Sequence, residues 1–278
     1  MLEVPPLRSL ERNPELMRAA VYEREITSSI DGVWENVFDW EHLPWLHSQA
    51  FDSIELREAG DWGWHADLGF ASGAASEIEL VVDRPGSCYV ARTRSGSGAA
   101  GEIWTSLDPV ASDRTAIRVE FWVPPLPEEQ LEQIGNALRS VYTGLWDQDE
   151  EMMVVRDRAR TRRASDATQQ GGSPGAYRDL GLWSELRPQL PQVVEFEGHR
   201  FRIVELAGVP IAHAVECPHW LGPLEACPVE AGVITCPWHG YRFDVASGQS
   251  ADDRGMRLRP APRVEIDPES DRVRLVSD

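Results

Sequence analysis

Residues 217–224 read CPHWLGPL and residues 236–244 read CPWHGYRFD, and these two stretches decide how the rest of the chain is interpreted. One residue separates Cys217 from His219, and two residues separate Cys236 from His239. Each pair lies in a segment that contains Gly and Pro, which is typical of a loop. Two thiolate–imidazole pairs in two loops are suited to a site with two metal ions. The alternative is that these four side chains merely fill a small core.

The spacing of the four residues distinguishes between metals. Zinc sites with Cys₂His₂ ligands usually combine C-x₂₋₄-C with H-x₃₋₅-H, and this sequence does not. Two Cys on one iron and two His on the other form a Rieske-type [2Fe–2S] cluster, whose His ligands raise the reduction potential. The stretch closely resembles the Rieske domain of ferredoxins and ring-hydroxylating oxygenases, over nearly all of 177–278. The resemblance implies that Cys217, His219, Cys236 and His239 hold a [2Fe–2S] cluster.

Further positions narrow the class of Rieske protein that the segment resembles. The Rieske proteins of cytochrome complexes resemble this motif but add one Cys to each loop, and a disulfide joins the two. Pro223 and Trp238 stand at those positions here, so the ferredoxin or oxygenase type is favoured. We expect Cys227 and Cys88 to be packing residues rather than ligands. Four cysteines in 278 residues are too few for a disulfide scaffold, which favours a reducing, cytoplasmic location.

The sequence before this segment predicts an α+β domain. A short helix is expected from about Val33, and a long final helix from about residue 127. Strand patterns occur at residues 20–29, 76–83, 88–94, 101–107 and 115–123. One stripe of the long helix is expected to face a core, and it consists of Leu131, Ile134, Leu138, Val141, Leu145 and Met152. This order of elements describes a helix-grip (START-like) fold, in which a curved antiparallel sheet surrounds the helix and leaves an apolar cavity.

A polar segment divides the chain into two folded units. Residues 163–176, RASDATQQGGSPGA, contain Gly and no periodicity, so they predict a linker. We therefore expect an N-terminal lead at 1–19, a helix-grip catalytic domain at 20–162 and a small all-β Rieske domain at 177–278. The last of these contains short strand patterns that Gly and Pro interrupt.

Residues 36–47 read NVFDWEHLPWLH and contain a second candidate metal site. Two His and one carboxylate on one face form the facial triad of non-haem Fe(II) oxygenases, which leaves coordination positions open. We expect Pro44 to break the helix and bring the second imidazole round. The pattern D-x₂-H-x₄-H, here Asp39, His42 and His47, resembles that of the catalytic domains of Rieske oxygenases. Taken without the Rieske motif, these histidines could equally be packed or solvated.

The third ligand must be an acid from elsewhere in the fold, and the long helix contains LWDQDEEMMV at 145–154. Asp149 continues the apolar stripe, whereas Asp147 and the two glutamates that follow Asp149 fall toward other faces. An ionised acid in an apolar stripe is costly unless it is paired or binds a metal. The segment also resembles the last helix of the oxygenases, where an acid before an apolar pair supplies the third ligand. We predict Asp149 as the ligand and Asp147 as the alternative; a purely acidic helix surface is the other interpretation.

Asp39 is expected to have a different role from the ligands. It lies three residues before His42, so on a helix the two side chains share a face. Accepting the N–H of a ligating His would fix the tautomer of that imidazole and aim it at the metal. The resemblance further implies that Asp39 contacts a cluster histidine, His219 or His239, and so bridges the two centres. A helix-capping or surface carboxylate is the alternative.

Together the two sites resemble the Rieske non-haem iron oxygenases, but in reversed order, because that family usually places the Rieske domain first. The resemblance implies a terminal oxygenase component with a [2Fe–2S] cluster and Fe(II), which activates dioxygen and oxidises a small hydrophobic substrate. It also implies a homo-oligomer, commonly a trimer with electron transfer between subunits; the reversed order makes transfer within one chain possible. The alternative is an electron-transfer or ligand-binding Rieske protein without the mononuclear iron.

Composition limits the partners of the chain. The net charge of −19 argues against nucleic acid or an anionic membrane surface. No run approaches the roughly 18 apolar residues of a membrane span, and the N-terminus has no signal-peptide stretch. No dinucleotide fingerprint or flavin motif is visible, so we expect a separate reductase or ferredoxin to supply electrons. Five tryptophans near the proposed iron suit an apolar substrate cavity or simply a core: Trp34, Trp40, Trp45, Trp62 and Trp64.

Overall fold

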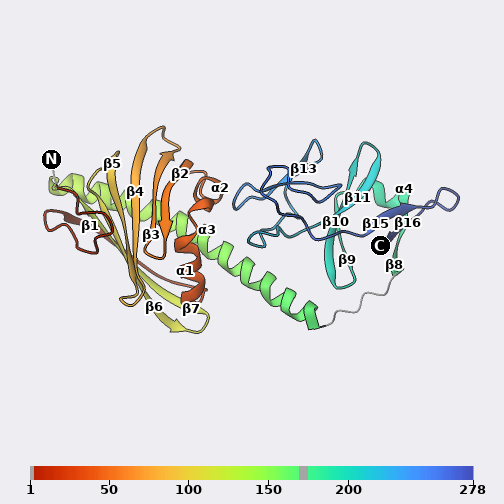
Figure 1. Cartoon of the computed structure of the whole chain (residues 1–278), viewed down its shortest axis with the longest axis horizontal. Helices are drawn as coiled ribbons and strands as arrows, with labels where there is room; N and C mark the ends of the chain where they lie inside the picture. Colours follow the sequence, from red (N-terminus) through yellow and green to blue (C-terminus); the bar gives the residue numbers. More distant parts are fainter. Residues whose placement is uncertain (1–2, 169–174, 278) are drawn as a thin grey trace. The chain divides into compact units, whose positions relative to one another are not determined.

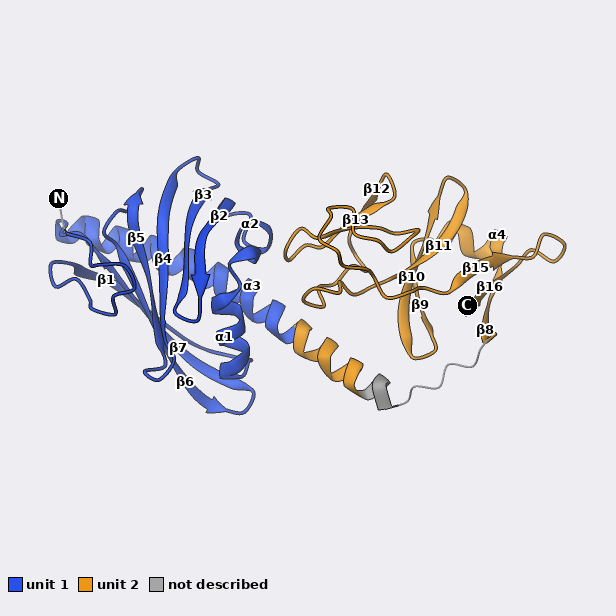
Figure 2. Cartoon of the chain, viewed as in Figure 1, with its two compact units in different colours: residues 1–154 blue, residues 155–278 orange. Residues whose placement is uncertain are grey.

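The computed structural model of the chain describes residues 3–168 and 175–277. The chain forms two compact units, residues 1–154 and residues 155–278 (Figure 2). Within the described ranges, no helix has both the length and the apolar character that a membrane span needs.

The first unit is built on a seven-stranded antiparallel sheet with the order β1-β7-β6-β5-β4-β3-β2 (Figure 1). Its strands are β1 (Met17–Ile26), β2 (Phe51–Gly60), β3 (Gly63–Phe70), β4 (Ala75–Asp83), β5 (Cys88–Gly96), β6 (Glu102–Ala111) and β7 (Arg114–Val123). Short helices lie between β1 and β2, namely α1 (Ile30–Phe38), the 3₁₀ helix η1 (Trp40–His42) and α2 (Leu43–Leu46). The long helix α3 (Glu128–Thr168) follows β7 and contributes Trp146 and Met153 to the core of this sheet. This is a helix-grip arrangement, and it confirms the predicted α+β fold.

The strands that the sequence predicted in this unit are all present. In β7, the alternating residues Ile117, Val119 and Phe121 are at most 2% exposed, which explains why their period-two pattern was readable. The hairpin β2–β3 was not predicted. In β3, His65 is buried between Trp64 and Ala66, so burial does not alternate clearly and the sequence pattern is weak.

The face that α3 presents to the sheet is rotated slightly from the predicted stripe. Ile134 is 37% exposed, so the prediction that it faces the core was wrong, whereas Val141, although 49% exposed, lines an apolar cavity of the same unit. The helix lies close to the sheet at Gly135, where a Cβ atom would lie 2.4 Å from the carbonyl oxygen of Ala19. This contact requires glycine, and further along the helix Met152 is 1% exposed as predicted.

The residues before β1 are anchored on the sheet by a buried arginine. Arg92 is fully buried, and its Nε donates to Glu102 Oε1 at 2.9 Å. Its Nη1 donates to the carbonyl oxygen of Ser9 at 3.0 Å and its Nη2 to that of Glu11 at 3.1 Å. The predicted lead at 1–19 therefore packs on the sheet over its described part, and β1 begins at Met17 rather than at residue 20.

The predicted linker at 163–176 is helical in its first part. Helix α3 continues to Thr168, because the Arg- and Ala-rich stretch before that residue consists of good helix formers. Residues 169–174 of the predicted linker lie outside the described residues, and the next strand begins at Tyr177.

The second unit contains three small antiparallel sheets, β11-β10-β9, β12-β13-β14 and β15-β16-β8. Their strands are β8 (Tyr177–Leu182), β9 (Gln192–Phe196), β10 (His199–Leu206), β11 (Val209–Ala214), β12 (Val229–Glu230), β13 (Val233–Thr235), β14 (Arg242–Asp244), β15 (Arg263–Ile266) and β16 (Arg272–Val276). One helical turn, α4 (Trp183–Leu186) with the 3₁₀ turn η2 (Arg187–Gln189), is the exception to the predicted all-β character. Phe201 and Ile203 of β10 pack with Leu275 of β16 in a common core.

Candidate metal centres

His42 and His47 lie at the two ends of α2. A non-helical residue before α2 sets the direction of both side chains. Helix α1 ends at Phe38, and Asp39 has φ −85° and ψ 79°, which is not helical. The expectation that Pro44 breaks a helix was wrong, because Pro44 lies in the first turn of α2, where proline is tolerated. The change of direction occurs at Asp39, and the turn of α2 then carries the chain from one imidazole to the other.

The predicted triad is brought together at the point where α2 faces α3. His47 Nε2 lies 3.1 Å from Asp149 Oδ1, and His42 Nε2 lies 3.4 Å from the same oxygen. One ligand atom from each of the three residues lies within 4.8 Å of the other two, and all three residues are buried. Asp147 points elsewhere, because its side chain is 61% exposed and pairs with Arg24.

The other ring nitrogen of each triad histidine lies near a side-chain oxygen, at hydrogen-bond distance for His47 and at ion-pair distance for His42. His47 Nδ1 lies 2.8 Å from Gln148 Oε1, and His42 Nδ1 lies 3.5 Å from Asp39 Oδ2. The Gln148 acceptor favours a proton on His47 Nδ1, so a metal ion could bind Nε2 in place of the proton that Nε2 shares with Asp149. Asp39 thus lies where the prediction for its role toward a ligating histidine requires it, while Gln148 was missed. The position of Gln148 next to Asp149 could have suggested it.

The carboxylate of Asp149 is oriented and kept ionised by its neighbours. Asn36 Nδ2, which sequence reasoning also missed, donates to Asp149 Oδ1 at 3.1 Å. Burial alone would raise the pKa of Asp149, but the hydrogen bond from His47 and the charges of both histidines outweigh it and lower that pKa. Burial likewise acts to lower the pKa of His47, and the contact with Asp149 more than reverses this. Asp149 is therefore a carboxylate at neutral pH, which is the form that binds a cation.

The triad lies in the wall of an apolar cavity of about 470 Å³ inside the first unit. The cavity is lined mainly by apolar side chains of the sheet and of α3, and its lining also includes Asp39 and Asn36. Of the five tryptophans that were expected beside the iron, Trp64 lines the cavity and the other four do not. Trp45 is instead 44% exposed, and Trp34 belongs to the buried core. Trp146 of α3 lines the cavity and was not predicted.

The second candidate centre is formed by two loops of the second unit that repeat the same backbone pattern. Cys217 N–H donates to Gly222 O at 2.9 Å, and Cys236 N–H donates to Tyr241 O at 2.8 Å, so each loop closes five residues after its cysteine. The residue four positions after each cysteine has a left-handed backbone, with φ 64° at Leu221 and 67° at Gly240. Two loops of one shape therefore present Cys217 and Cys236 in equivalent ways.

The four predicted cluster ligands converge between these loops. The His219 and His239 rings are 4.6 Å apart and nearly perpendicular, and the Tyr241 ring stacks on that of His219 at 4.2 Å. Cys217 and Cys236 are at most 1% exposed. A hydrogen bond between the two thiols raises the pKa of Cys217 and lowers that of Cys236, and the latter is also lowered by the His239 side chain.

Local features of the loops fit a metal–sulfur group. Backbone N–H groups of the residues that follow each cysteine donate to its sulfur, and such donors favour a thiolate. A Cβ atom on Gly222 would lie 2.7 Å from Cys236 Sγ, so only glycine lets the first loop approach the second cysteine. All four cysteines of the chain are free, and Cys227 Sγ donates to Pro223 O at 3.3 Å. Cys88 lies in β5 of the first unit.

Comparisons with known proteins identify a domain family in the second unit. Residues 178–262 match the Rieske [2Fe–2S] domain family. In a search of curated proteins, none matched the chain significantly. Similar solved structures include a START superfamily protein from Mycobacterium smegmatis, with 16% identity and a TM-score of 0.40 over 48% of this chain and 97% of that one. The Zhui aromatase/cyclase from Streptomyces sp. R1128 has 11% identity and a TM-score of 0.45 over 52% and 98%. This chain thus carries a Rieske [2Fe–2S] domain at residues 178–262, and a helix-grip domain precedes it.

Proposed function

We propose that the chain is the terminal component of an oxygenase, in which the first unit holds a mononuclear Fe(II) and the second unit holds the [2Fe–2S] cluster. The Rieske domain by itself indicates an iron–sulfur electron-transfer role. The observation that supports an oxygenase with a mononuclear Fe(II) is the convergence of His42, His47 and Asp149 within 4.8 Å at the wall of an apolar cavity.

A carrier of electrons or of a ligand has no use for this second donor set. Burying a carboxylate beside two imidazoles costs free energy that an apolar wall would not cost. Two His and one carboxylate with open positions are the ligands that non-haem Fe(II) oxygenases use. The Gln148 acceptor orients the His47 imidazole to bind through Nε2, and the Asp39 carboxylate lies 3.5 Å from Nδ1 of His42, so both imidazoles have an oxygen behind the nitrogen that faces away from the site.

When bound, the cluster supplies single electrons and the Fe(II) ion supplies the activation of dioxygen for insertion into a C–H or C=C bond. The residues of this chain bind and orient. Asn36 holds the carboxylate of Asp149 in place through the Oδ1 atom that both histidines approach. Gln148 accepts a hydrogen bond from Nδ1 of His47, and the Asp39 carboxylate lies 3.5 Å from Nδ1 of His42. The predicted contact of Asp39 with His219 or His239, and with it the bridge between the centres, stays a prediction.

The cavity supports a small, hydrophobic and uncharged substrate. The carboxylates of its lining, Asp39 and Asp149, are both engaged with histidines, and among the described residues no arginine lines it. A carboxylate or ammonium group of a ligand would therefore be desolvated there without a compensating charge. Electrons are expected from a separate reductase or ferredoxin, because the chain shows no nucleotide or flavin motif.

The proposal is tested by exposing the reduced protein to ¹⁸O₂ with a panel of neutral hydrocarbons and aromatic compounds. Compounds that bind in the cavity should accelerate reoxidation of the [2Fe–2S] cluster. Each should be converted to a hydroxylated product that contains ¹⁸O. A matched Asp149→Asn protein should bind the same compounds and incorporate no ¹⁸O. Binding without ¹⁸O incorporation in the wild-type protein would assign the chain to ligand binding or electron transfer instead.

A further inference from the structure

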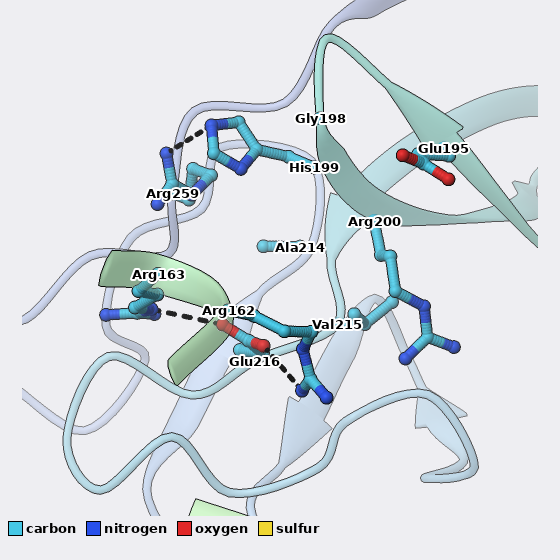
Figure 3. Close-up of a pocket in the computed structure, with 10 residues that line it drawn as sticks. All are labelled: Arg162, Arg163, Glu195, Gly198, His199, Arg200, Ala214, Val215, Glu216 and Arg259. Carbon is cyan, nitrogen blue, oxygen red and sulfur yellow. Dashed lines mark hydrogen bonds and ion pairs between the residues drawn. The ribbon is translucent and has the colours of Figure 1, made fainter. Parts of the chain in front are cut away.

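A concave site of about 220 Å³ on the second unit is unusually rich in arginine (Figure 3). Four arginines and two glutamates line it, whereas the whole chain has 27 basic and 46 acidic residues. We call the four arginines the arginine cluster, and they are Arg162, Arg163, Arg200 and Arg259. A cationic surface on a chain of net charge −19 needs an explanation beyond composition.

The arginine cluster is only partly neutralised by its neighbours. Arg200 forms an ion pair with Glu225. Arg162 Nη2 and Arg163 Nε both bind the carboxylate of Glu216, each at 3.1 Å, so two cations share one anion. Arg259 Nη1 lies 3.0 Å from His199 Nε2. Within the described part of the chain, each of the last three guanidinium groups contacts its partner through one nitrogen and keeps other N–H donors (Figure 3).

The site borders the cluster loop along the chain. Its wall includes Ala214 and Glu216, and Glu216 is bonded directly to Cys217, the first predicted cluster ligand. Nearby on α3, the Arg156 guanidinium lies 3.6 Å from the ring centroid of Trp220, which belongs to the same loop. A molecule that binds at the arginine cluster therefore lies next to the loop that carries the predicted [2Fe–2S] ligand Cys217.

The exposure of the arginines favours a protein surface over a small enclosed anion. The side chains of Arg162, Arg163 and Arg200 are 49%, 35% and 44% exposed. A site for a small anion would bury its guanidinium groups around the ligand, whereas half-exposed ones can meet several carboxylates on a flat partner. Exposed ion pairs contribute little to stability, but complementary surface charges strongly accelerate encounters between oppositely charged proteins.

We propose that the arginine cluster is the docking surface for an acidic redox protein that reduces the Rieske centre. In this encounter one electron leaves the reduced iron–sulfur or flavin group of the donor, and one Fe(III) of the cluster becomes Fe(II). No bond forms or breaks. The inference rests only on the electron-accepting part of the proposed function, so it holds or fails independently of the mononuclear iron.

The test is stopped-flow reduction of the oxidised cluster by a reduced acidic [2Fe–2S] ferredoxin, followed by the loss of visible absorbance. The variant is Arg162→Gln with Arg200→Gln. The matched control is Arg187→Gln with Arg272→Gln, two arginines of the same unit that are 55% and 46% exposed and each form one surface ion pair. At low ionic strength the variant should be reduced about tenfold more slowly than the wild type, and the control nearly as fast as the wild type. At high salt the three rates should converge.

A change of opposite sign sharpens the test. Glu195 lines the same site and is exposed, so Glu195→Gln should make reduction faster at low ionic strength. The proposal is overturned if the wild-type rate does not rise as salt falls, or if variant and control slow equally. Slowing that persists at high salt would mean that the cluster itself has changed, and this also overturns it. Binding of inorganic phosphate below about 1 mM, with unchanged ferredoxin rates in the variant, would reassign the site to a small anion.

Discussion

The two candidate metal centres are built in opposite ways. The cluster site consists of two short loops that follow one another closely in sequence and share one backbone shape, so its four ligands could be identified from local spacing. The triad instead joins His47 to Asp149 across 102 positions, and it depends on how a long helix is rotated against a sheet. A local motif can be read directly from a sequence, whereas a ligand set drawn from distant elements requires the packing of a whole domain.

The largest effect is expected from removing a ligand of the local site, the predicted [2Fe–2S] cluster. Cys217→Ser or His239→Ala should abolish the visible absorption of the protein, since each change removes one of the four predicted ligands of the cluster. Absorption spectra of the purified proteins measure this. Cys227→Ser is the control and should keep its colour, because that thiol contacts Pro223 O. Colour that survives both ligand changes contradicts the cluster assignment.

Removing a ligand of the triad should have an effect confined to the first unit. His42→Ala, His47→Ala or Asp149→Ala should each lose the mononuclear iron and turnover while the cluster spectrum persists, because the two sites lie in separate units. Metal analysis and absorption spectra give both readouts. Asp147→Ala is the control and should retain the iron, since that exposed side chain pairs with Arg24. The reverse result, with iron lost only from Asp147→Ala, moves the third ligand to Asp147.

Asp39→Asn tests the link between the two centres. The amide keeps the shape but loses the negative charge beside His42 Nδ1, so both metals should stay near full occupancy while product formation falls about 10–100-fold. Rapid mixing with dioxygen and substrate should show slow reoxidation of the cluster. Asp31→Asn, an exposed acid of α1, is the control and should behave as the wild type. An unchanged reoxidation rate in Asp39→Asn removes the bridge from the account.

Gln148→Ala is expected to weaken the triad without destroying it. His47 Nδ1 loses the acceptor that lies 2.8 Å away, so the Kd for Fe(II) should rise about tenfold. Anaerobic titration of iron-free protein with Fe(II) measures this. Gln133→Ala, an exposed residue of the same helix, is the control. Equal affinities in all three proteins would show that Gln148 does not orient the imidazole.

The smallest expected effect concerns the helix rotation itself. Gly135→Ala places a methyl group against the carbonyl oxygen of Ala19 and should lower the free energy of unfolding by about 1–3 kcal/mol. Gly144→Ala meets no atom within 4 Å and should instead raise that free energy by about 0.5–1 kcal/mol, through helix propensity. Urea unfolding of both variants measures the difference. If the two changes are equivalent, Gly135 does not set the position of α3.

The fold class followed from the sequence because strong periodic patterns were present, and the members of the triad were predicted from a ligand motif and its resemblance to the oxygenases. The β7 alternation and the position of Asp149 in α3 needed only the strand and helix periods. The exposure of Ile134 could not be foreseen, because it depends on how α3 is rotated against the sheet, and the neighbouring Gly135 is the residue that approaches β1. Pro44 was misread because proline ends a helix or begins one, and only the backbone at Asp39 decides which.

Iron stoichiometry is the most direct test of the claim that the helix-grip unit is a second metal centre. Wild-type protein, reconstituted anaerobically with Fe(II) and desalted, should contain about three Fe per chain, two in the cluster and one at the triad. Asp149→Ala should contain about two Fe with the same visible spectrum. About two Fe per chain in both proteins would contradict the account and leave an electron-transfer or ligand-binding Rieske protein.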